Sequence, residues 1–93
     1  MENNQQKIEI KATEETFKGV YANNALIMHT QNEFVIDFMS ILPPKGMLGA
    51  RVIMSPSAMK RVLQALQTNI ARYEQQHGEI ELGEEPSPQK FTH

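Results

Sequence analysis

The feature that most constrains this fold is a run of apolar residues that repeats every three or four positions. Ser55 and Pro56 ahead of the run are typical of a helix start, and Gly78 after it is typical of a helix end. The spacing therefore predicts a helix of about 22 residues ending at His77, ~33 Å long, with a heptad stripe along one face. The residues with this spacing are Met59, Leu63, Leu66, Ile70, Tyr73 and His77.

Shorter segments have the apolar patterns of β-strands. They are residues 8–12, 20–30, 33–42 and 49–54, and residues 79–82 could add an edge strand. Residues 13–18 are predicted to be a polar link. Gln31–Asn32 suits a hairpin turn, and the loop at 43–46 begins with two prolines, which cannot continue a central strand. We predict an α+β fold: an antiparallel three- to four-stranded meander sheet followed by one long amphipathic C-terminal helix packed on one face.

The chain is small, with 93 residues and no Cys. We predict a disordered N-terminus at 1–6, a single α+β domain at 7–78, and an acidic, mostly disordered tail at 79–93. Neither a disulfide nor a thiolate-held metal reinforces so small a core, so we expect a dimer or higher oligomer. No apolar run has the length of a membrane span or of a signal peptide, and the default expectation is a cytoplasmic protein without a membrane partner.

Apolar side chains fall on both faces of the predicted strand at 33–42, so each face should be covered. Together with the heptad stripe, this pattern predicts an interface with a second copy or another partner. The six Met residues of the sequence could belong to such a binding face or, alternatively, fill an ordinary hydrophobic core, since Met suits both. The candidate interface residues are Val35, Asp37, Met39, Leu63, Leu66, Ile70 and Tyr73.

Asp37 is the one charge within the apolar stretch at 34–39. A carboxylate buried there needs partners, and Arg51 and Asn23 on neighbouring strands are the candidates. The three residues are predicted to form a structural polar network that fixes strand register or an interface. A ligand-binding or acid/base role for Asp37 is the alternative.

Charge is segregated along the chain although the formal net charge is only −2. Residues 38–73 contain five Lys or Arg and no Asp or Glu, whereas both flanking segments are acidic. Cations in the first turn of a helix oppose its dipole unless an anion binds there. One interpretation is a surface for an anion, a phosphate or an acidic partner, and the alternative is solvated charge that pairs with the acidic ends of the chain. The candidate residues are Lys45, Arg51, Lys60 and Arg61.

Motifs for chemistry are missing from the sequence. It has no nucleophile elbow, no phosphate-binding glycine loop and no zinc-protease motif, and its three His are scattered. We therefore predict no catalytic residues, no metal and no cofactor, and expect a protein that is not an enzyme.

Several short motifs in order resemble a prokaryotic family known only as domain-of-unknown-function family 3467. The likeness extends over residues 19–78 and implies no catalytic residues. It implies a layout similar, at the level of fold, to the secretion chaperone SecB. Some relatives are encoded beside the large subunits of RNA polymerase, which implies an accessory or transcription-linked role. The motifs are Gly19–Asn23, His29, Glu33–Phe38, Pro43–Pro44, Arg51–Val52, Ser55–Pro56, Leu63, Leu66, Asn69–Ile70, Tyr73–Glu74 and Gly78.

Three hypotheses for function follow. The first is a non-enzymatic, homo-oligomeric binding or accessory protein attached to a larger assembly, with RNA polymerase as the named candidate. The second is a SecB-like holdase that uses an apolar, Met-rich groove. The third is an anion or nucleic-acid binder that uses the basic segment at 38–73, for which any nucleic-acid contact would depend on salt.

Overall fold

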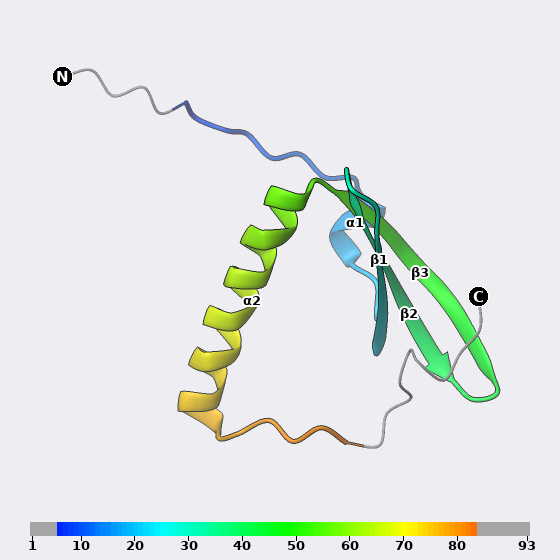
Figure 1. Cartoon of the computed structure of the whole chain (residues 1–93). Helices are drawn as coiled ribbons and strands as arrows, with labels where there is room; N and C mark the ends of the chain where they lie inside the picture. Colours follow the sequence, from blue (N-terminus) through cyan, green and yellow to red (C-terminus); the bar gives the residue numbers. More distant parts are fainter. Residues whose placement is uncertain (1–5, 84–93) are drawn as a thin grey trace.

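The computed structural model describes residues 6–83 of the chain, which form a three-stranded antiparallel sheet between a short and a long helix (Figure 1). The predicted α+β class is confirmed, and the sheet has three strands. The predicted disorder at 1–6 and 79–93 lies largely outside the described residues. The elements are α1 (Glu14–Lys18), β1 (Asn24–His29), β2 (Phe34–Leu42), β3 (Lys45–Met54) and α2 (Pro56–His77).

The strands form a meander in the order β1-β2-β3, with β2 in the centre. The β1–β2 register runs from Asn24 opposite Met39 to His29 opposite Phe34. The β2–β3 turn is tighter than the predicted loop, because β3 already begins at Lys45 after a cis Pro43–Pro44 pair. The two prolines cannot donate to the ladder, but the pairing resumes directly after them.

Three predictions about local structure are wrong. Residues 8–12 form no strand and their side chains are exposed, and residues 79–82 form no edge strand either. Alternation is not sufficient for a strand, and this segment pairs with neither β1 nor β3 although these are the edge strands of the sheet. Residues 14–18, within the predicted polar link at 13–18, form α1 instead, because Thr13 caps the Thr16 amide and acidic residues fill the first turn.

Helix α2 has the predicted bounds. Ser55 is its N-cap, whose hydroxyl accepts from the Ala58 amide at 3.2 Å, and Gly78 ends it with a positive φ of 92°. No residue of α2 is buried, however. Neither helix among the described residues is both long and apolar enough to cross a bilayer.

The prediction that α2 packs along one face of the sheet is wrong. The helix meets the sheet only near its start and then leads away from it (Figure 1). An amphipathic pattern shows that one face of a helix needs cover, but it does not say which surface provides the cover.

The segment that enters β1 is anchored from both sides. The Asn23 side chain brackets the Ile41 backbone, donating to its carbonyl and accepting from its amide, both at 2.9 Å, while the Asn23 amide donates to the Met39 carbonyl. The same segment passes so close to β3 at Gly49 that a Cβ there would lie 2.7 Å from Val20 Cγ1. These contacts hold the chain entering β1 against the central strand.

Replacing Asn23 with alanine should lower the free energy of unfolding by about 1–3 kcal/mol, because both polar groups of the Ile41 backbone lose their partner in a partly buried place. Urea unfolding measures the change. Asn32→Ala, in the exposed β1–β2 turn, is the matched control and should alter stability by less than about 0.5 kcal/mol. Equal losses in the two variants would show that the Asn23 anchor contributes nothing.

Candidate functional site

The one ion pair that joins two strands in the described part of the chain links Asp37 and Arg51, which lie opposite each other on β2 and β3. Arg51 Nε donates to Asp37 Oδ1 at 2.6 Å, and Nη2 donates to Oδ2 at 2.8 Å. Only 1% of the Asp37 side chain is exposed, whereas about half of the Arg51 side chain is. The bidentate geometry compensates the carboxylate for its lost hydration.

The hydrogen bond to Asp37, and then the Asp37 charge, raise the pKa of Arg51 above its ordinary value, against a small opposing effect of desolvation. A cation with a raised pKa keeps its pairing at every pH below that ordinary value, so Arg51 stays charged throughout the working pH range. The pair acts as a permanent clamp between β2 and β3. Arg51 is therefore already engaged by a carboxylate within the chain.

The predicted polar network is divided in two. Asp37 and Arg51 pair as described, while the Asn23 amide group binds the Ile41 backbone farther along β2. Both parts contribute to strand register, one across β2–β3 and the other at the start of β1.

The four candidate anion-binding residues do not come together. Lys45 opens β3 at the β2–β3 turn, whereas Lys60 and Arg61 follow the other end of that strand. Met54 lies nine positions after Lys45 along β3, or about 30 Å away. Since Arg51 is held by Asp37, the described residues offer no joint basic site of the kind predicted, and no group of three metal-binding side chains either.

The predicted interface residues lie on two separate surfaces. Asp37 and Met39 are buried within the sheet, and Val35 is half-buried, so the β2 part of the set has little free surface. The α2 part stays open: Leu63, Leu66, Ile70 and Tyr73 are 46%, 53%, 46% and 52% exposed. We call these four residues the α2 seam.

The α2 seam begins in an apolar hollow between the helix and the sheet, with a volume of about 310 Å³. We call it the α2–sheet cleft. Sequence reasoning did not find this cleft, because the contact of β1 and β2 with the first turns of α2 depends on how the helix leaves β3. Its lining residues are Ile27, Phe34, Pro56, Met59, Lys60 and Leu63.

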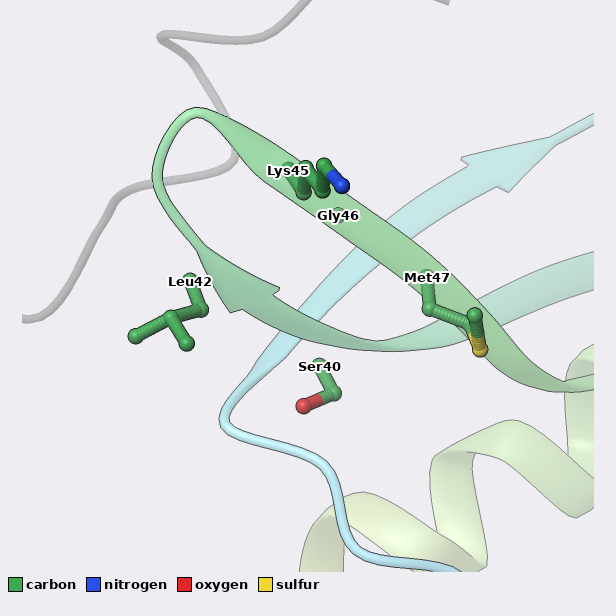
Figure 2. A pocket seen from close by; sticks show the side chains of 5 residues that line it. All are labelled: Ser40, Leu42, Lys45, Gly46 and Met47. Atoms are coloured by element: carbon green, nitrogen blue, oxygen red, sulfur yellow. The ribbon is translucent and has the colours of Figure 1, made fainter.

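A second hollow, of about 350 Å³, lies at the far end of the β2–β3 hairpin (Figure 2). We call it the hairpin hollow. Leu42 and Met47 belong to it and are 80% and 71% exposed. The sequence contains a signal for this surface, because the large apolar residues Leu42 and Met47 flank a turn, and turns are usually polar. The surface was not predicted from this signal. The lining residues are Ser40, Leu42, Lys45, Gly46 and Met47.

Comparison with known proteins identifies the family and no more. The family model described as "Protein of unknown function (DUF3467)" matches residues 1–82, and the chain belongs to this family. No curated protein and no solved structure matches the chain. The predicted likeness to SecB stays a prediction.

Replacing Arg51 with methionine should destabilise the sheet strongly, because it leaves the buried Asp37 carboxylate without its cationic partner. The urea midpoint of unfolding measures the loss. Arg72→Met, on exposed α2, removes the same cation and should leave the midpoint nearly unchanged. The double variant Asp37→Leu/Arg51→Met should recover most of the lost stability, since no unpaired charge remains. A double variant as unstable as Arg51→Met would contradict this account of the clamp.

Proposed function

We propose that this protein is a non-catalytic, homo-oligomeric binding module that attaches to a larger protein assembly. The hairpin hollow is the proposed attachment surface. RNA polymerase is the candidate assembly, on the strength of the family resemblance alone. The observation that carries the proposal is the exposure of Leu42 and Met47 at the tip of a rigid hairpin.

A hairpin tip is well suited to binding because the strands behind it are held in place. The Asp37–Arg51 pair and the Asn23 anchor both lie along the same sheet. Because the backbone of the hairpin is already held in place, its ordering adds little to the entropic cost when a partner covers the apolar side chains. Met47 adds a flexible thioether that adapts to irregular partner surfaces.

Lys45 gives the hairpin hollow its charge. It is the cationic member of the lining, and no acidic residue lines the hollow with it. An apolar surface with one cation suits a partner segment that combines aliphatic side chains with a carboxylate. Binding of this kind has an apolar component that survives salt and an ionic component that salt weakens.

The test is capture of purified core RNA polymerase on the immobilised full-length protein. We expect retention that Leu42→Ser weakens about tenfold or more, as is usual for a central apolar contact of an interface. Ile8→Ser is the matched control, because Ile8 is 82% exposed against 80% for Leu42 but lies outside the sheet. Nuclease treatment of the polymerase removes any bridging nucleic acid.

Retention that is equal in the Leu42→Ser and Ile8→Ser variants would exclude the hairpin hollow as the attachment surface. No retention of polymerase by the unaltered protein would remove RNA polymerase as the candidate. If a native extract then yields no other stoichiometric assembly, the attachment role itself is excluded.

A holdase is a second candidate function, favoured by the apolar lining of the α2–sheet cleft and by the open α2 seam. It requires this surface to stay accessible to unfolded clients. Equimolar protein should then suppress thermal aggregation of a model client, and Leu66→Ser should reduce this suppression at least severalfold. Unchanged light scattering of the client would rule the holdase out.

A further inference from the structure

The α2 seam is a row of apolar side chains that stay about half exposed in the described chain. A helix of 22 residues gains most of its stability from packing of its apolar face, yet no residue of α2 is buried. Its apolar residues keep a strict heptad spacing, which is the pattern that a second helix fits. The surface that covers the seam is therefore expected to be helical.

We propose that the α2 seam is covered by α2 of a second copy, antiparallel to it, across a two-fold axis near residue 68. The proposal rests on the homo-oligomeric part of the proposed function and identifies the face and the register. Each protomer then contributes the same seam to an isologous interface, as two-fold symmetry requires. The hairpin hollow stays free in both copies.

The heptad positions select one register. Two antiparallel helices with their seams in contact place Leu66 against the partner's Ile70 and Leu63 against the partner's Tyr73. Each layer then pairs a heptad a position of one helix with a d position of the other. Met59 lies against the partner's His77 at the two ends of the seam. Every large apolar residue of the seam has an apolar or aromatic neighbour in this arrangement, and none is left over.

The charges beside the seam agree with this register and disagree with a parallel one. Lys60 and Glu74 each follow a seam position by one residue, on the same side of the helix. In the antiparallel register Lys60 faces the partner's Glu74, twice by symmetry, and Gln67 faces its own copy. A parallel pair would leave both charges without an oppositely charged contact across the interface.

The same register explains why the cationic Lys60 lies near the N-terminus of α2, where the helix dipole disfavours a positive charge. No acidic residue occupies the first turn of α2, while Lys60 and Arg61 lie close behind it. A cation near a helix N-terminus opposes the helix dipole. In the antiparallel dimer the C-terminal end of the partner helix comes beside Lys60, and its dipole and Glu74 both attract the ammonium group.

The α2–sheet cleft lies beside the end of the proposed dimer interface. Leu63 and Met59 line it, so their predicted neighbours, the partner's Tyr73 and the partner's His77, reach its open side. Within one chain these two rings already contact each other, with centroids 4.8 Å apart. In the proposed dimer, this pair of rings covers the open side of a cleft that is lined by Ile27 and Phe34.

Charge reversal with rescue tests the register. Sedimentation equilibrium of the full-length protein should show a dimer, and Lys60→Glu should weaken it roughly 10- to 100-fold, because two like-charge contacts replace two attractive ones. Lys60→Glu/Glu74→Lys should restore dimerisation. Arg61→Glu is the matched control: it makes the same charge change one residue along, off the seam, and should leave the dimer intact.

Unfolding of α2 would not explain a weaker dimer in the Lys60→Glu variant. An acidic residue near the N-terminus favours the helix, so Lys60→Glu does not weaken α2 itself. Glu74→Lys also removes the bond from the Ile80 amide to Glu74 Oε2, and circular dichroism checks that helicity is retained. A monomer for the unaltered protein at tens of micromolar, including one in which α2 folds back onto its own sheet, would overturn the proposal. A double variant that stays as weak as Lys60→Glu would do the same.

Cysteine pairing gives an independent test, because the natural chain contains no Cys. A mixture of Lys60→Cys and Glu74→Cys chains should form the mixed disulfide on oxidation, while either chain alone should not cross-link. Efficient self-pairing of Lys60→Cys chains would exclude the proposed register. Both tests use the protein alone, so a failed dimer with polymerase capture intact removes only this inference, and the reverse result removes only the attachment role.

Discussion

Every buried side chain in the described part of this protein belongs to the central strand β2. Ile36, Met39 and Ile41 form the buried apolar core, and Asp37 is the buried charge among them. A core confined to one strand depends on keeping both neighbours of that strand in register, since a slip by one residue would move every side chain of the strand to the other face and separate Asp37 from Arg51. The Asp37–Arg51 clamp on one side of β2 and the Asn23 anchor on the other supply this register.

A core confined to β2 occurs together with an open α2. Apolar side chains of β1 and β3, such as Ile27 and Ile53, stay exposed, because only the first turns of the ~33 Å helix reach the sheet. The helix meets the sheet in the α2–sheet cleft, and the side chains of its seam are about half exposed. Beyond its first turns the helix leads away from the sheet (Figure 1). A larger domain obtains such burial within one chain, and the proposed dimer would supply it here from a second copy.

Local signals in the sequence were sufficient for α2 and for the strand order. Ser55, Pro56 and Gly78 determine the helix ends through their own backbone chemistry, and the prolines at 43–44 separate β2 from β3. The distance between the basic residues could not be predicted from such local signals. Lys45 and Lys60 are close in sequence, but a straight strand lies between them and sets them far apart. The exposed segment at 8–12 likewise has the alternation of a strand, yet it pairs with neither edge strand of the sheet.

The two open surfaces differ in a way that matters for what they bind. The α2 seam is periodic, with layers repeating every three or four residues, and a periodic surface is matched best by another helix. The hairpin hollow is irregular, small and partly lined by Met, and it has no repeat for a helix to follow. A surface of that kind is matched by a single projecting segment, which a large assembly can offer and a second copy of α2 cannot. Symmetric self-association and attachment to a different protein therefore need not compete, since a dimer built on the α2 seam presents two hairpin hollows to its partner.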